Sequence, residues 1–267
     1  MPMTARSFTS RRAALLAATL LLPVRTVSAD DIRVMTSGSF TAAYFELTPQ
    51  CERVTRDTFV TVTTTIGTGP AYIPTRLQRG EAADVVIVDD ATLLQMIKDG
   101  LVRSDSRVDL ARSSIGMAVR AGAPRPDISS VEALKRTLLQ AKSIAYSASV
   151  SGRYLTTELF PRLGIADEVM HKARRIEGER VGTVVARGDA DIGFQQISEL
   201  LPIPGIDFVG PLPPEVQRTT VFSAGIVTAS RNANGARALI ACLAGPEATG
   251  AVTKSGLEPM MHAEERR

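Results

Sequence analysis

The chain is poor in the residue types on which several classes of protein depend. It has no tryptophan, and aromatic residues make up only 4% of it. This argues against a carbohydrate-stacking platform and against an aromatic nucleic-acid surface. It has two histidines and two cysteines, and none of the four has neighbours with the spacing of metal ligands. We therefore expect no metal and no cofactor.

The body of the chain also lacks the positive charge of a nucleic-acid binder. The formal charge of the whole chain is +3, but residues 1–29 hold four arginines and no acid. The remaining residues are close to neutral, so no nucleic-acid partner is expected. With 267 residues, 44% hydrophobic and 22% charged, the composition is that of a globular chain of one or two domains.

No apolar run is long enough to span a bilayer. The longest near the N-terminus covers 13–23 and follows Arg11 and Arg12, whereas a spanning helix needs about 20 residues. This order, followed by small residues up to Ala29, is typical of an export signal. The segment 1–29 is therefore predicted to be a signal peptide, and the mature chain is predicted to be periplasmic. The pair Arg11-Arg12 fits the twin-arginine export pattern.

Cys51 and Cys242 are the two cysteines, and they lie far apart in the sequence. In an oxidising compartment they could form one disulfide, or they could remain two buried thiols. The spacing does not decide between these alternatives.

Sequence patterns alternate between strand and helix from Asp30 onward. The run 83–88 is almost continuously apolar, as in a strand buried on both faces of a parallel sheet. The alternation predicts an α/β fold with a mostly parallel sheet. The basic run 171–175 is interpreted as a solvated face. Strands are expected at 32–36, 59–65, 83–88, 115–119, 143–146, 190–194, 206–209 and 221–227, and helices at 41–56, 71–79, 91–99, 130–141, 153–163, 180–187 and 233–243.

Four small-residue turns precede predicted helices, two in each half of the chain. Carboxyl ends of parallel strands share one edge of a sheet, where α/β folds bind ligands. Free backbone N–H groups and hydroxyls at such turns favour anions. Because the nucleotide-binding and nucleophile-elbow motifs are absent, the pattern favours an anion-binding cleft. The four turns are 37–39, 67–69, 147–152 and 178–182.

Three collinear stretches resemble the periplasmic molybdate-binding proteins of ABC importers. They are 77–87, 182–194 and 243–248, and the similarity extends from about Asp30 to Pro259. The resemblance implies a two-lobed α/β periplasmic binding protein of type II with two crossover hinge strands. Lobe 1 would comprise 30–114 plus 222–267, and lobe 2 would comprise 115–221. The crossovers would fall near 115–118 and 221–224.

The resemblance also implies which residues contact the ligand. Gly67-Thr68-Gly69 stands where the family has serines, and Gln196 where it has a tyrosine. Arg153 adds a cation to a pocket that is neutral in the family, which suits an organic carboxylate as well as an oxyanion. The predicted ligand-binding residues are Ser37, Ser39, Gly67, Thr68, Gly69, Ser149, Ser151, Arg153, Val181 (through its backbone N–H) and Gln196.

The leading hypothesis is an exported, monomeric solute-binding protein that delivers a small anion to the membrane permease of an ABC importer. The same superfamily contains an exported aconitate isomerase, which is the alternative. An enzyme of that kind needs a base that removes a proton α to a carboxylate. Glu179, Glu199 and Tyr146 are the candidates near the expected cleft, and each also has an ordinary structural interpretation.

Overall fold

The computed structural model of this chain describes residues 31–62, 64 and 69–260. The predicted signal segment 1–29 lies outside the described residues. The strands are β1 Asp31–Thr36, β2 Thr58–Val62, β3 Val85–Asp89, β4 Val108–Arg120, β5 Ile144–Ser147, β6 Ala173–Ile176, β7 Ile192–Gln196, β8 Ile206–Pro211, β9 Thr219–Ile226 and β10 Glu258–Pro259.

Helices follow most of the strands. The α-helices are α1 Thr41–Thr55, α2 Ile73–Gln78, α3 Asp90–Lys98, α4 Val131–Gln140, α5 Val150–Tyr154, α6 Phe160–Arg162, α7 Ala166–Met170, α8 Val181–Arg187, α9 Ile197–Leu200, α10 Ala233–Ala244 and α11 Thr249–Lys254. Shorter turns are the 3-10 helices η1 Gly38–Phe40, η2 Ser104–Ser106, η4 Pro214–Val216 and η5 Pro246–Ala248, and the π-helix η3 Leu155–Leu159.

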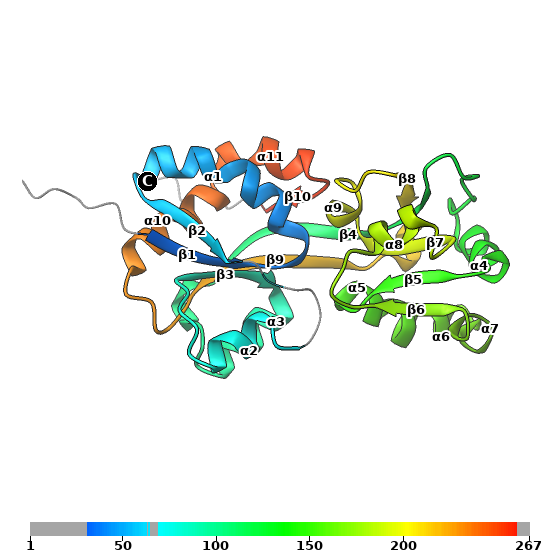
Figure 1. The fold of residues 1–267 in the computed structure, drawn as a ribbon, viewed down its shortest axis with the longest axis horizontal. Coiled ribbons are helices and arrows are strands. Elements are labelled where there is room, and N and C mark those ends of the chain that lie inside the picture. Colours follow the sequence, from blue (N-terminus) through cyan, green and yellow to red (C-terminus); the bar gives the residue numbers. More distant parts are fainter. Residues whose placement is uncertain (1–30, 63, 65–68, 261–267) are drawn as a thin grey trace, which may run out of the picture.

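Lobe 1 is built on strands in the order β2-β1-β3-β9-β4. β1 pairs in parallel with β2 and β3, and β9 runs antiparallel to β3. Helices α1, α10 and α11 lie on one side of these strands, and α2 and α3 lie on the other (Figure 1). Because both faces are covered, Val85, Val86, Ile87 and Val88 are all buried, as their continuous apolar run predicts.

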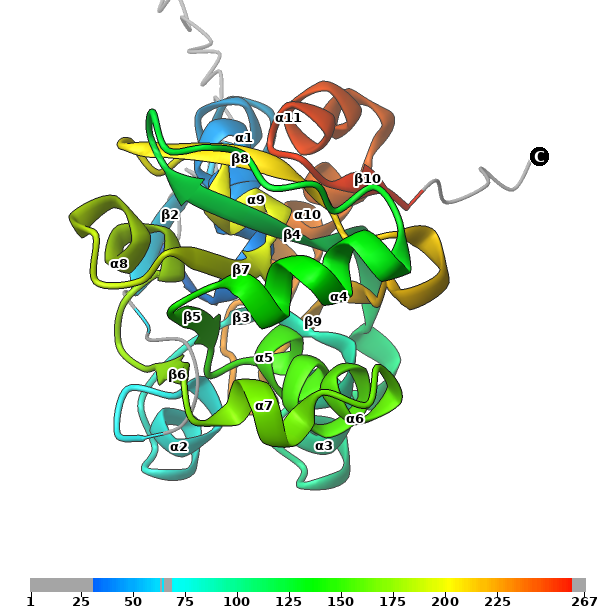
Figure 2. The ribbon, with the colours of Figure 1, turned by 90° about the vertical axis from the view of Figure 1, so that its right-hand side faces the viewer.

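Lobe 2 continues the sheet in the order β4-β7-β5-β6, with β8 paired to β4. One face packs on α4, η3 and α6, with Leu134, Leu155 and Phe160 fully buried there. The other face packs on α8 through Val184 and Val185. Figure 2 looks at this lobe from its end and shows α8 separated from α4, α6 and α7 by the strands.

Two long strands connect the lobes. β4 pairs with β9 through Ser114 and with β7 from Ile115 onward, so it passes from one lobe into the other within a single strand. The chain returns through β9, which pairs with β3 in lobe 1. These pairings establish the two-lobed fold, and the lobe boundaries at 114/115 and 221/222 stay a prediction.

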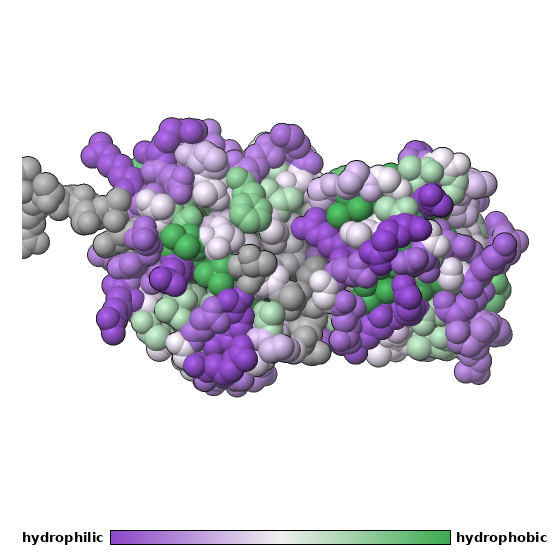
Figure 3. All heavy atoms as spheres, viewed as in Figure 1, coloured by the Kyte–Doolittle hydropathy of each residue, from purple (hydrophilic) through white to green (hydrophobic). Residues whose placement is uncertain are grey.

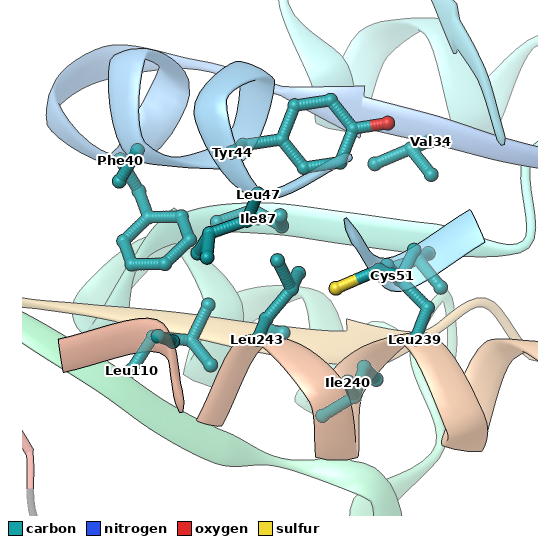
Figure 4. Close-up of a cluster of buried hydrophobic side chains, with 14 of the residues drawn as sticks. Val34, Phe40, Tyr44, Leu47, Cys51, Ile87, Leu110, Leu239, Ile240 and Leu243 are labelled. Carbon is teal, nitrogen blue, oxygen red and sulfur yellow. The ribbon is translucent and has the colours of Figure 1, made fainter. Parts of the chain in front are cut away.

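The core of lobe 1 is closed by a contact between α1 and α10. Tyr44 and Leu47 of α1 face Leu239 and Leu243 of α10, above Ile87 of the sheet (Figure 4). At the end of this contact Cys51 and Cys242 form a disulfide with a Cα–Cα distance of 5.8 Å. The structure therefore selects the disulfide from the two states that the sequence allowed.

Two expectations about the elements were wrong, and one strand, β6, was not predicted. The sheet is not mostly parallel, because among the described strands the crossover strands pair antiparallel with their neighbours. The strand expected at 115–119 is only the second half of β4, since the polar residues Arg112, Ser113 and Ser114 interrupt the apolar pattern. The basic run 171–175 contributes to β6, whose Arg174 and Arg175 are exposed at the sheet edge.

Polar residues dominate the surface. In the space-filling view hydrophilic side chains cover much of both lobes, and apolar side chains appear as small separate patches (Figure 3). Among the described residues no helix is long and apolar enough to cross a bilayer.

Candidate functional site

A cavity of about 280 Å³ lies between the two lobes. It is formed where β1 ends and α1 begins, at the end of β2, and in the β6–α8 connection of lobe 2. This is the edge of the sheet that the sequence predicted to bind a ligand. The lining residues are Thr36, Ser37, Gly38, Thr41, Phe45, Thr61, Val62, Thr64, Gly178, Glu179 and Arg180.

Hydroxyl groups supply most of the polar lining on the side of lobe 1. Thr36 and Thr41 join through their hydroxyls at 3.4 Å, and the Thr64 hydroxyl donates to the Thr36 carbonyl. Thr61 meets the Tyr44 hydroxyl at 3.1 Å. These bonds hold the hydroxyl oxygens in place beside the N-terminal turn of α1, where unpaired backbone N–H groups favour a negative charge. This side of the cavity therefore suits an anion.

Arg180 brings a positive charge to the cavity from lobe 2. Among the described residues its guanidinium forms no hydrogen bond or ion pair, so its donors are available to a ligand. The carboxylate of Glu179 beside it is bound to another residue, because it accepts two hydrogen bonds from Arg187, at 2.7 and 3.1 Å. These bonds lower the pKa of Glu179, which therefore stays ionised and is a poor proton donor.

Glu199 lies behind the cavity rather than in its lining. It belongs to α9, which packs against η1, and its side chain is almost fully buried. Burial raises its pKa to about 7, with the positive charge of Arg180 and the amide of Gln195 acting in the opposite direction. A carboxyl group of this kind can both take and give a proton near neutral pH.

The structure brings some of the predicted site residues to the cavity. Ser37 lines it directly, and its N–H donates to the Ile87 carbonyl at 3.1 Å. Ser39 is the middle residue of η1, and its hydroxyl is buried without a hydrogen-bond partner. Gly69 is exposed with a φ of +114°. Gly67 and Thr68 lie outside the described residues.

The serine-containing turn 147–152 of lobe 2 does not line this cavity. Ser147, Ser149 and Ser151 link their hydroxyls to one another at 2.6 and 3.4 Å, at the start of α5. Arg153, two residues further on, is exposed. Contact of Ser149, Ser151 and Arg153 with a ligand thus stays a prediction.

Two other predicted residues are engaged within the protein. The backbone N–H of Val181, expected to face the ligand, donates to Gln195 Oε1 at 2.9 Å. The buried amide of Gln196 spans the crossover strands, donating to Ser113 Oγ at 2.8 Å and accepting from Thr220 Oγ1 at 3.1 Å. In this conformation both groups join parts of the protein, so their contact with a ligand also stays a prediction.

Tyr146, a candidate base from the sequence, is packed in the core of lobe 2. Burial explains its position fully, and it does not line the cavity described here. Of the three candidates, only Glu199 combines burial with a position next to the cavity.

Sequence reasoning missed Arg180 and the threonines that line the cavity. Arg180 lies inside the turn 178–182, which the sequence had indicated as a helix start, so a usable signal was present. The basic character of Arg153, next to a serine turn, led the sequence to place the carboxylate contact in a part of the chain that does not line this cavity. Thr61 lies near the end of β2 and Thr64 follows that strand, and neither has a pattern that marks a binding residue.

The described residues contain no group of three or more His, Cys, Asp or Glu that could hold a metal ion. The polar groups that line the cavity are hydroxyls, the Arg180 guanidinium and the Glu179 carboxylate held by Arg187, and the buried Glu199 carboxyl lies behind them. Such a set binds negatively charged organic groups or oxyanions and offers one site for proton transfer.

The fold is that of a two-lobed periplasmic binding protein. The sequence profile of bacterial extracellular solute-binding proteins matches residues 32–258. The chain therefore belongs to this family.

Individual relatives differ in what they do. An aconitate isomerase of Pseudomonas sp. is 45% identical over 249 residues, which covers 93% of this chain and 94% of the relative. The periplasmic molybdate-binding protein of Azotobacter vinelandii has a TM-score of 0.66 at 18% identity, covering 85% of this chain and 98% of that one. Peb3 of Campylobacter jejuni has a TM-score of 0.65 at 15% identity, covering 85% and 99%. The last two share the fold.

Proposed function

We propose that this protein binds aconitate in the cavity between its lobes and interconverts the cis and trans isomers. The observation that carries the proposal is the 45% identity to an aconitate isomerase along nearly the full length of both chains. The cavity supports it, because it combines an arginine from lobe 2 with a cluster of hydroxyl groups from lobe 1.

The lining suits a small tricarboxylate. Arg180 can form a bidentate pair with one carboxylate, and Ser37 and Thr41 offer hydroxyls at the start of α1 for another. Phe45 lines the same cavity and is 55% exposed, so it offers an apolar surface to the carbon skeleton. Closure of the lobes would then bring groups from both sides onto one ligand.

The reaction needs little beyond binding and one proton transfer. The methylene carbon of aconitate carries protons α to a carboxylate, and removal of one allows the double bond to move along the three central carbons. Return of a proton to the other end gives the second isomer. Donors that hold the carboxylates stabilise the charge that develops in between.

Capture of a small anion for import is the second candidate function. It is favoured by the family to which the chain belongs and by the two-lobed fold. A binder of this kind would work as a monomer in the periplasm and deliver its ligand to the permease of an ABC importer. It would need no proton-transfer group.

Incubation of the purified protein with cis-aconitate, followed by chromatography, distinguishes the two functions. An isomerase at catalytic concentration converts cis-aconitate until the two isomers reach a constant ratio, and trans-aconitate approaches the same ratio from the other side. Recovery of unchanged cis-aconitate by a protein that nevertheless binds it would contradict the proposal and favour the binder. Molybdate and citrate serve as comparison ligands in the binding arm.

A further inference from the structure

Buried polar atoms without partners gather behind the cavity. Among the described residues, the buried side-chain atoms that lack a hydrogen-bond partner are Ser39 Oγ, Gln195 Nε2, Ser198 Oγ and Glu199 Oε1. One belongs to η1 and the others to β7 and α9, and η1 packs against α9. An unpaired buried polar group costs about 1–3 kcal/mol. A cluster at one point of contact between the lobes therefore calls for a functional explanation.

Gly38 separates this cluster from the cavity. It lines the cavity, has a φ of +71°, and has no side chain to fill the space toward α9. A Cβ at this position would lie 3.9 Å from Glu199 Oε1 and 3.0 Å from the ring of Phe222. The buried carboxyl group thus lies directly behind Gly38 in the cavity wall, with the ring of Phe222 packed beside it.

Charged groups around Glu199 allow it to exist in both protonation states. Arg180 is the cation whose charge acts on it, and the Gln195 amide also favours the ionised form. Desolvation acts more strongly in the opposite direction and places the pKa at about 7. Glu179, the other acid of this region, is held by Arg187 and does not share this property.

We propose that Glu199, whose buried Oε1 lacks a partner behind Gly38, is the catalytic residue that carries the proton in the isomerisation, and that it reaches the ligand past Gly38 when the ring of Phe222 moves aside. The inference rests on the proposed function. The Glu199 carboxylate takes a proton from the methylene carbon, and the electrons of that C–H bond form a new double bond to the central carbon. The original double bond opens, with its charge delocalised into the adjoining carboxylate. The same carboxyl group then returns the proton to the far carbon, so Glu199 ends as it began and no oxidant or reductant is required.

The test compares wild type with Glu199→Gln, which keeps the shape of the side chain but cannot take the proton. Both proteins are incubated with cis-aconitate in D₂O and followed by proton NMR. The wild type is expected to form trans-aconitate, whose far carbon carries protium when Glu199 returns the proton that it took and deuterium when the carboxyl group has first exchanged with the solvent. Glu199→Gln is expected to lose at least about 100-fold in rate and to introduce no deuterium. Ligand-induced rise in melting temperature, measured on both, shows whether the variant still folds and binds.

Glu199→Asp provides a second variant, because it keeps the acid but shortens the side chain. It is expected to regain part of the rate that Glu199→Gln loses. A Glu199→Gln protein that isomerises within a few-fold of wild type would overturn the role of Glu199 and leave the proposed function in place. A wild type that binds aconitate without converting it would overturn both.

Discussion

At the scale of the residue, the buried Glu199 links stability to pH. Its pKa is raised from 4.5 to about 7 in the folded protein, so the folded state holds a proton that the unfolded state releases. The contribution of Glu199 to the free energy of unfolding should therefore be greatest below about pH 4.5. It should fall between pH 4.5 and about pH 7 and stay constant above about pH 7. The contribution lost is about 3 kcal/mol at most.

Urea unfolding at several pH values measures this contribution. The decline is expected in wild type and not in Glu199→Gln, whose amide does not titrate. At pH 8 the variant should be the more stable of the two, because it no longer buries a charge. Parallel pH profiles for the two proteins would contradict the assignment of a raised pKa to Glu199.

Gly152 is a second residue whose identity the fold requires. A Cβ there would lie 1.7 Å from the carbonyl oxygen of Ser147, a backbone atom that cannot move aside cheaply. Gly152→Ala should therefore destabilise the protein by about 3 kcal/mol, as overpacked core positions do. Gly250→Ala in α11 is the matched control, since nothing lies within 4 Å of its added Cβ. Equal unfolding midpoints for both variants would contradict the close approach at Gly152.

At the scale of the element, the disulfide joins helices that are distant in sequence. Cys51 of α1 and Cys242 of α10 are 191 positions apart. Closing so long a loop restricts the unfolded chain, and disulfides of this kind contribute about 2–5 kcal/mol. Reduction should lower the urea midpoint accordingly, while a Cys51→Ala/Cys242→Ala double variant should be insensitive to reductant. An unchanged midpoint on complete reduction would show that the bond adds no stability.

The sequence predicted the elements whose pattern is local and missed those set by tertiary pairing. Runs such as 83–88 and the helix 131–140 have clear apolar spacing, and both were placed within a few residues. β4 was found only in part, because Arg112 is exposed and Ser114 half-buried where the strand crosses between the lobes. β6 was missed because its exposed arginines lie at a sheet edge, where burial does not shape the sequence.

The candidate site was predictable to a similar degree. Small residues before helices indicated Ser37 and the turn that holds Arg180, and both line the cavity. Thr61 and Thr64 could not be found, since only the fold brings the end of β2 against the start of α1. Glu199 was named as a candidate, but its burial, which gives it an unusual pKa, is a property of the packed lobes.

At the scale of the whole molecule, the predicted signal segment 1–29 would direct the protein to the periplasm. If residues 1–29 are a signal peptide, mass spectrometry of the periplasmic protein should show a chain that begins near Asp30. The disulfide fits an oxidising compartment. An intact chain retained in the cytoplasm would contradict export. Arg11→Lys/Arg12→Lys, which keeps the charge but removes the twin-arginine pair, would show whether that route is used.

In the proposed site the ligand lies between the lobes, with Arg180 as its main cationic contact. Calorimetric titration with propane-1,2,3-tricarboxylate tests this most directly, because this saturated analogue of aconitate has no double bond to move. Arg180→Ala should weaken binding by about 10–100-fold, through loss of a charge-assisted pair. Arg153→Ala, compared in parallel, tests the carboxylate contact that the sequence favoured, and Lys98→Ala on α3 is the control for lost surface charge. Wild-type affinity in Arg180→Ala would contradict the site proposed here.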